Sequence, residues 1–297
     1  RLGPLGIRGE AHFELGRYRQ AFVVAERSLD ARPDMASYAR ASYAAELRGN
    51  HREAIALMRL AAESGLPGDP ARAGLQLQLG LLLLREGRIS AAGRVFRTIG
   101  RENPGDPEAV IGAARVAVAR GQLARAERLY ERGIVELPDA DHWAELADVQ
   151  WALGKRSAAR RSVAEARAGL AEGAEIEDNA VERVLLEADW TRPGPALVAE
   201  ARAARERRPS IVGDAALGWV LTRAGRCAEA HRVATRSLRL GTRDPLMIFR
   251  AAMAASCAGE ADEAAALARR ARDLNPRFSA RWAPVAALLA GDRPRSG

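Results

Sequence analysis

The sequence has few of the side chains that build metal or disulfide sites. Its 297 residues include only two cysteines and four histidines. Cys227 and Cys257 are too few for a disulfide framework and lack zinc-ligand spacing, so two unpaired thiols are favoured over a single bridge. The histidines lie far apart in the sequence: His12, His51, His142 and His231. We therefore expect no metal site.

Catalytic motifs and long hydrophobic runs are also lacking. No Gly-x-Ser-x-Gly, Walker A or His-Glu-x-x-His pattern occurs, so we expect neither an enzyme nor a cofactor. The longest apolar run, Leu79 to Leu84, is followed by Arg85 and is far shorter than the ~18 residues of a membrane span. The chain begins Arg1-Leu2, without Met or a signal-peptide pattern. We expect a fragment that lacks its native N-terminus, which leaves a cytoplasmic or exported localisation open.

Aromatic residues and lysine are scarce, whereas arginine is abundant. The formal net charge is +8, and Lys155 is the only lysine among 46 Lys and Arg residues. Codon bias in a GC-rich genome explains this composition, and a preference for acidic partners or membranes is the alternative. One segment is distinctly basic, through Lys155, Arg156, Arg160, Arg161 and Arg167. We interpret it as a solvated convex face, with an acidic protein or a membrane surface as the alternative contact. Nucleic acid is not expected, because interleaved aromatic side chains are missing there.

Glycine recurs along the chain at nearly constant intervals. The positions are Gly16, Gly49, Gly87, Gly121, Gly154, Gly225 and Gly259, and Arg192 stands in the one gap. A small residue follows five positions after each glycine, at Ala21, Ala54, Ala92, Ala126, Ala159, Ala230 and Ala264. Most steps are 33 or 34 residues and two are 38, which places insertions near residues 66–72 and 168–178. Such a period predicts stacked copies of one small unit.

Each period divides into two expected helices. In residues 107–139, Asp106-Pro107 supplies an N-cap and a proline at the first helical position. Gly121 ends the first helix near residue 120, because glycine adopts the left-handed conformation without penalty. The second helix is expected from about residue 123 to 136, and Pro138 prevents its continuation. No stretch shows the alternation typical of a strand.

The spacing of large and small residues resembles that of the tetratricopeptide repeat. Trp143, Leu146 and Ala147 match the opening of that repeat. A fuller match is given by Leu79, Gly80, Leu83, Ala92, Phe96 and Pro104. The resemblance implies an all-α fold, a right-handed α-solenoid of about eight helix-turn-helix units. The ending Asn275-Pro276-x-Phe278-Ser279 resembles multi-repeat proteins of bacteria.

On this frame the whole chain, 1–297, is expected to be a single solenoid. Its repeats would occupy residues 2–34, 35–68, 73–106, 107–139, 140–172, 178–210, 211–244 and 245–278. A capping helix over 279–290 would cover the last repeat.

In this family the first helices line a concave groove, which the resemblance maps onto positions of this chain. Those positions are Tyr43, Leu77, Leu81, Ile111, Arg115, Asp148, Trp151, Trp219, Phe249, Arg250 and Met253. Exposed aromatic groups in a concavity favour partner binding, and the alternative is that they seal the next repeat's interface. Arg115 or Arg250 would pair with an acidic group of the partner. The family's carboxylate clamp is not expected, because its asparagine is missing.

These features predict a non-enzymatic scaffold that binds another protein or a peptide in its concave groove. The alternative is a ligand- or peptide-sensing repeat domain of a larger regulator or secretion-associated protein. The identity of the partner and the oligomeric state do not follow from the sequence.

Overall fold

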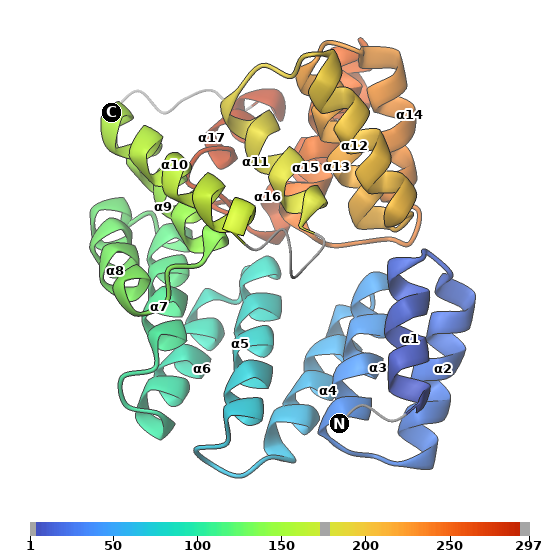
Figure 1. The fold of residues 1–297 in the computed structure, drawn as a ribbon, viewed down its shortest axis with the longest axis vertical. Coiled ribbons are helices and arrows are strands. Elements are labelled where there is room, and N and C mark those ends of the chain that lie inside the picture. Colours follow the sequence, from blue (N-terminus) through green and yellow to red (C-terminus); the bar gives the residue numbers. More distant parts are fainter. Residues whose placement is uncertain (1–3, 173–178, 292–297) are drawn as a thin grey trace.

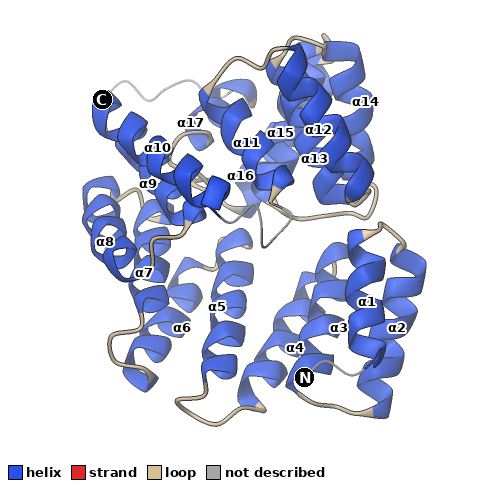
Figure 2. Ribbon diagram, viewed as in Figure 1, coloured by secondary structure: helices blue, strands red, loops and turns tan. Residues whose placement is uncertain are grey.

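The computed structural model describes residues 4–172 and 179–291, so part of the second expected insertion, 168–178, lies outside the described residues. All regular secondary structure in the described part is helical (Figures 1 and 2), which confirms the all-α class. The helices are α1 (Pro4–Glu14), α2 (Tyr18–Ala31), α3 (Met35–Leu47), α4 (His51–Glu63), α5 (Pro70–Arg85), α6 (Ile89–Glu102), α7 (Pro107–Ala119), α8 (Leu123–Glu136), α9 (Ala140–Ala152), α10 (Arg156–Glu172), α11 (Ala180–Trp190), α12 (Pro195–Arg207), α13 (Ile211–Arg223), α14 (Cys227–Ser237), α15 (Pro245–Cys257), α16 (Ala261–Leu274) and α17 (Ala283–Leu289). None of these helices is long and apolar enough to cross a membrane.

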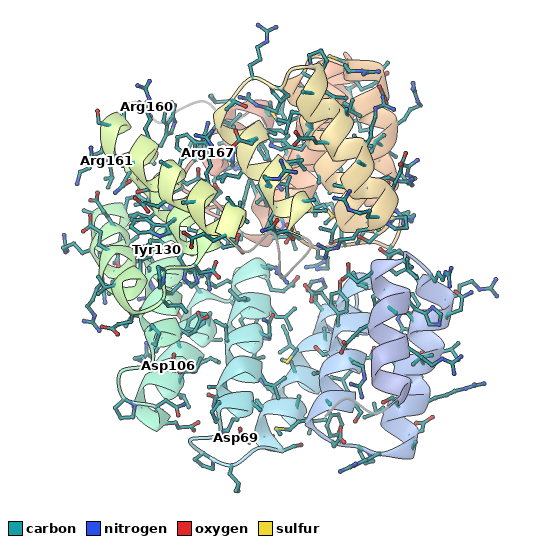
Figure 3. The ribbon with its side chains drawn as sticks, viewed as in Figure 1. Asp69, Asp106, Tyr130, Arg160, Arg161 and Arg167 are labelled. Carbon is teal, nitrogen blue, oxygen red and sulfur yellow. A yellow bond between two sulfur atoms is a disulfide. The ribbon has the colours of Figure 1, made fainter. Side chains whose placement is uncertain are left out.

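The first sixteen helices form consecutive pairs, and aspartate and glycine set their ends. Asp69, Asp106 and Asp244 are N-caps, each followed by proline, and their carboxylates accept backbone N–H groups at 2.8–2.9 Å (Figure 3 labels the first two). The seven periodic glycines all lie between paired helices with φ from +63° to +87°. Residues with a side chain rarely adopt this backbone conformation, so glycine is favoured there.

The periodic alanines lie in the core of the array. All seven are fully buried: Ala21, Ala54, Ala92, Ala126, Ala159, Ala230 and Ala264. The first helix of a pair also has a small residue where the second helix places a large side chain. A Cβ added at Gly80 would come within 3.0 Å of the Phe96 ring, for example. Small residues on both helices therefore allow the close packing of each pair.

The array of pairs curves so that its first three glycine turns meet its last three repeats. The pairs α1–α2 and α3–α4 lie beside α12–α14 across the molecule (Figure 1). The N-terminal glycine turns abut loops far along the chain: Gly16 lies against Pro209, Gly49 against Gly241, and Gly87 against Leu274. A Cβ at any of these three glycines would come within 3.0 Å of the opposing carbonyl oxygen.

Hydrogen bonds and ion pairs accompany this closure. The Tyr18 hydroxyl accepts the Ile211 N–H at 2.7 Å, and the Asn275 side-chain amide donates to the Leu84 carbonyl at 2.8 Å. Arg243 donates to both oxygens of Glu86 at 2.8 and 2.9 Å. Polar contacts of this kind, two of them buried, favour one relative arrangement of the N-terminal and C-terminal repeats.

The two cysteines form a disulfide bridge, so the expectation of two unpaired thiols is wrong. Cys227 begins α14 and Cys257 ends α15, and their Cα atoms are 5.0 Å apart. Each lies two residues from a turn glycine, Gly225 or Gly259. Stacking of adjacent repeats places these turns side by side, which brings residues separated by 30 positions within bonding distance.

The last helix is shorter than the range 279–290 expected for the cap. Helix α17 spans only Ala283–Leu289, and the segment before it runs along the first helices. Phe278 packs on Phe249 with ring centroids 5.7 Å apart, and Trp282 packs on Trp219 at 5.4 Å. The chain after α16 therefore covers part of the surface on which a groove was expected.

Candidate functional site

A cavity of about 390 Å³ lies on the side of the first helices. Its walls come from α5, α7 and α9, from the start of α15, and from the segment 275–280. The apolar part of the lining includes Leu81, Leu84, Val118 and Phe278. We call this space the inner cavity. Its size lies within the usual range of ligand and peptide pockets.

Helix α9 gives the inner cavity an acidic wall. Asp141, Glu145 and Asp148 all line it, and their spacing of four and three residues places them on one helix face. Glu145 is neutralised by Arg115, whose Nε lies 2.9 Å away. Across the cavity, Arg85 pairs with Glu46 and, at 3.3 Å, with Asp244.

The other two carboxylates of this wall have raised pKa values. Burial and the neighbouring Asp189 raise the pKa of Asp148 to about 7, although Arg281 opposes the shift. Partial desolvation and the charges of Glu145 and Asp139 raise the pKa of Asp141 to about 6. Burial disfavours the charged form of a carboxylate, and a further cation close to it would lower its pKa again. The wall can therefore accept a cationic group from a partner.

Arg281, from the segment before α17, lies among three tryptophans. Its guanidinium carbon is 4.9 Å from the ring centroid of Trp151, 4.2 Å from that of Trp190, and 4.6 Å from that of Trp282. Nη2 donates to the backbone carbonyl of Asp189 at 2.8 Å, and Nη1 lies 3.7 Å from Asp148. These contacts hold the C-terminal segment in place beside the inner cavity.

Three of the expected groove residues line the inner cavity, namely Leu81, Arg115 and Asp148. Ile111, Trp219 and Phe249 are at most 1% exposed, which favours the alternative that they fill the interface. The half-buried residues are Leu77, Trp151, Arg250 and Met253. Tyr43 is 38% exposed and packs edge-on against Phe13, away from the cavity.

The structure does not favour the acidic partner group that the sequence predicts. Arg115 pairs with Glu145, and Arg250 lies 3.3 Å from Asp189. Neither arginine is free to pair with an acidic group, whereas Asp141 has no ion pair in the described part of the chain. Asp141 and Glu145 are not among the residues predicted from the sequence. Their spacing of seven and three residues from Asp148 could have placed all three on one face of a helix.

The basic segment on α10 is largely engaged within the chain. Lys155 pairs with Glu127 at 2.6 Å, Arg156 stacks on Trp151, and Arg167 pairs with Glu187 at 2.6 Å. Arg160 and Arg161 are exposed on the outer side of α10 (Figure 3). This distribution agrees with the interpretation of a solvated face.

Comparison with known proteins gives a family match. Residues 83–148 match the model of the family described as tetratricopeptide repeat. No curated protein matches the chain. Within the described residues, no cluster of His, Cys, Asp or Glu could hold a metal ion.

Solved structures of similar fold include three proteins of low sequence identity. The Rap conjugation gene regulator of plasmid pLS20, in complex with the Phr* peptide, has a TM-score of 0.56 and 14% identity. The alignment covers 80% of this chain and 75% of that one. The APC/C hetero-tetramer Cut9-Hcn1 has a TM-score of 0.48 and 16% identity, covering 95% of this chain. This chain spans 55% of the length of that protein.

A tetratricopeptide repeat protein from Parabacteroides merdae has a TM-score of 0.45 and 13% identity, with 90% of this chain and 99% of that one covered. A bacterial origin of the present chain stays a prediction. The family match over 83–148 agrees with the paired helices, the buried periodic alanines and the glycine turns found along the chain. Over residues 83–148 the chain matches the tetratricopeptide repeat family, and the helix pairs of the described residues have the arrangement of that repeat.

Proposed function

We propose that the chain is a non-enzymatic scaffold, a single solenoid over 1–297, that binds a peptide or a segment of another protein in the inner cavity. The observation that carries the proposal is the pairing of an apolar wall with an acidic wall. Leu81 and Val118 can bury apolar side chains, and Asp141 and Asp148 lie on the face of α9 that lines the same space.

The partner segment is expected to carry a basic side chain. A lysine or arginine beside Asp141 and Asp148 would stabilise the charged form that burial and neighbouring carboxylates disfavour. Charge-assisted hydrogen bonds to these carboxylates would orient the segment, and burial of its apolar groups would supply affinity. A basic and apolar segment therefore fits the cavity better than the acidic group expected from the sequence.

The alternative proposal is that the cavity receives a signal for a larger regulator. The Rap regulator, which shares the fold, was solved in complex with the Phr* peptide. A regulator would need an output element outside the present chain, and the reading frame around the 297 residues would show whether one exists. Both proposals place the bound segment in the same cavity.

Selection of peptides on the immobilised chain tests the proposal. A random peptide display library should yield sequences enriched in Lys or Arg next to apolar residues. Leu81→Glu should weaken the selected peptides by about tenfold or more, because it adds a charge to the apolar wall. Leu66→Glu is the matched control, since Leu66 is 79% exposed in an outer loop. Equal binding by both variants would show that the cavity is not the site.

A further inference from the structure

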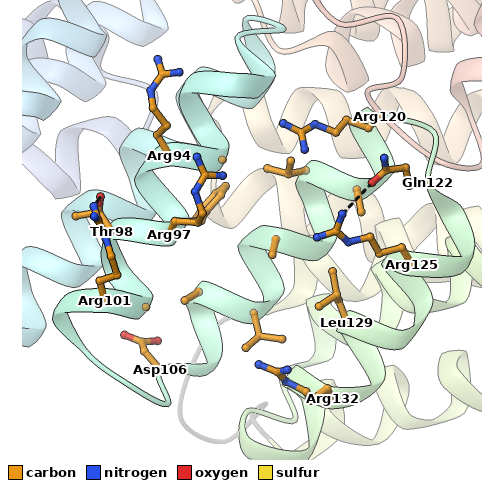
Figure 4. Close-up of a pocket in the computed structure, with 18 of the residues that line it drawn as sticks. Arg94, Arg97, Thr98, Arg101, Asp106, Arg120, Gln122, Arg125, Leu129 and Arg132 are labelled. Carbon is orange, nitrogen blue, oxygen red and sulfur yellow. Dashed lines mark hydrogen bonds between the residues drawn. The ribbon is translucent and has the colours of Figure 1, made fainter.

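A second cleft lies on the opposite, second-helix side of the molecule. Helices α6 and α8 form its walls and α7 its floor, around a volume of about 770 Å³ (Figure 4). The two spaces use different faces of α7. Ala113 and Ala117 line the outer cleft, whereas Arg115 and Val118 line the inner cavity. Occupation of one therefore does not require the other.

Small residues make this outer cleft deep. Gly93 and Gly100 on α6, together with Ala109 and Ala113 on α7, contribute little bulk to the lining. The partly exposed larger apolar side chains of the lining are Val110 on α7 and Leu129 on α8. The cleft therefore has an apolar base that the second helices leave uncovered.

Arginines surround this apolar base. Arg94, Arg97 and Arg101 project from one face of α6, Arg125 and Arg132 from one face of α8, and Arg120 lies at the end of α7 (Figure 4). None of the six has an ion pair in the described part of the chain. Two of the six donate side-chain hydrogen bonds, and both acceptors are neutral: Arg101 donates to Thr98, and Arg125 donates to Gln122.

Few carboxylates lie near these arginines. On two other second helices, α10 and α12, arginines pair with carboxylates of the next repeat: Arg167 with Glu187, Arg202 with Glu229, and Arg205 with Asp214. The lining of the outer cleft contains a single carboxylate, Asp106, which accepts the Glu108 N–H at 2.9 Å as an N-cap. Six cations thus face one anion that already has a role in the helix.

We propose that the outer cleft binds an acidic, amphipathic segment of a partner protein. Apolar side chains of the segment would lie on Val110, Ala113 and Leu129, and its carboxylates would pair with arginines on both walls. Arginine suits this task because its planar guanidinium binds carboxylates through two hydrogen bonds. This site is separate from the inner cavity and does not rest on the function proposed for it.

The lining favours a protein segment over nucleic acid. A phosphate backbone would be satisfied by the arginines alone and would leave the apolar floor exposed to water. Single-strand binders also offer aromatic platforms, and the one aromatic group here, Phe96, is only 2% exposed. Charge and floor together match a ligand that is both acidic and apolar.

Fluorescence anisotropy with a defined probe tests this proposal. The probe is a labelled helical peptide of Leu, Glu and Ala with Leu on one face, and the control peptide replaces Glu with Gln. Arg97→Gln with Arg125→Gln should weaken the acidic probe by about tenfold, because each removes a charged hydrogen-bond donor. The matched control is Arg160→Gln with Arg161→Gln, which removes two exposed charges from α10. Equal weakening by both pairs would mean general electrostatic attraction and would overturn the site.

A variant that fills the cleft tests the role of its floor independently of the arginines. Ala113→Trp keeps all six arginines and fills the base of the cleft, so it should also weaken the acidic probe by about tenfold. Unchanged affinity of a folded Ala113→Trp protein would contradict the proposal. If circular dichroism shows that this variant does not fold, the two arginine pairs decide.

Two further probes, a duplex DNA oligonucleotide and vesicles of anionic lipid, address the other anionic partners. If DNA or the vesicles bind more tightly than the acidic peptide, and if Arg97→Gln/Arg125→Gln abolishes that binding, the partner of the cleft is not a protein segment. Weaker binding of both would support the proposed protein partner.

Discussion

At the scale of single residues, Asp148 combines partial burial with a neighbour of like charge, Asp189. Its side chain is 25% exposed, and the one cation paired with it, Arg281, lies 3.7 Å away. Burial is the main cause of its raised pKa, and Asp189 adds to it. In the unfolded chain the same carboxyl would titrate near its ordinary pKa of 3.8. At this carboxyl the folded protein therefore binds up to one more proton than the unfolded chain between about pH 4 and pH 7.

We predict that Asp148 makes the protein less stable as the pH rises. Since the folded state holds the extra proton, the free energy of unfolding should fall between about pH 4 and pH 7 and level off above that range. Asp148→Asn, which resembles the protonated carboxyl, should make this slope shallower, while Asp141 keeps its own part of it. The substitution should stabilise the protein more at pH 8 than at pH 5. Urea unfolding at a series of pH values measures the effect.

The control for this prediction is Asp30→Asn on the exposed side of α2. It should leave the pH dependence of the wild-type protein unchanged. A wild-type slope retained in Asp148→Asn would mean that another group binds the proton.

At the scale of helices, local sequence signals predict the structure well. Asp106-Pro107 and Gly121 bound α7 in the structure as they do in the sequence pattern, and α8 spans Leu123–Glu136 as expected. Caps and glycine turns act within a few residues, so a single sequence is enough to predict where these helices begin and end. The cysteine bridge has no such local signal, because it joins the turns of two different repeats.

We predict that the bridge stabilises the last two repeats. Cys227 and Cys257 close a loop of 30 residues, and a bridge across such a loop contributes about 2–4 kcal/mol. Reduction should lower the free energy of unfolding by an amount in this range and increase amide exchange in α14 and α15. Cys227→Ser/Cys257→Ser should match the reduced protein and should not respond to reductant. An oxidised protein that reductant leaves unchanged in stability would show that the bridge contributes little.

At the scale of the whole molecule, closure of the array determines which surfaces remain available. Trp219 and Phe249 occupy first-helix positions that line the groove in this family, yet Trp282 and Phe278 cover them. The contacts that close the array join residues more than 150 positions apart, such as Arg243 and Glu86. Their formation depends on the summed twist of all repeats, which no local pattern in one sequence specifies. The inner cavity could therefore be predicted only in part, through Leu81, Arg115 and Asp148.

The turn glycines allow closure to be tested separately from turn geometry. All have positive φ, so replacement by alanine costs each turn about 1 kcal/mol of left-handed strain. Only some lie against an opposing backbone. A Cβ at Gly16, Gly49 or Gly87 would meet a carbonyl oxygen within 3.0 Å, whereas Gly154, Gly225 and Gly259 have no atom within 4 Å of that position.

We predict that alanine at all three contact glycines opens the molecule. Gly16→Ala/Gly49→Ala/Gly87→Ala should increase the radius of gyration in small-angle X-ray scattering, because the added methyl groups push the opposing loops away. Gly154→Ala/Gly225→Ala/Gly259→Ala carries the same strain without the clash, and it should keep the wild-type radius. Helical circular dichroism should stay the same in both variants. Equal radii for the two triple variants would mean that the ends of the array do not meet in solution, and the wall of the inner cavity formed by residues 275–280 would then lose its support.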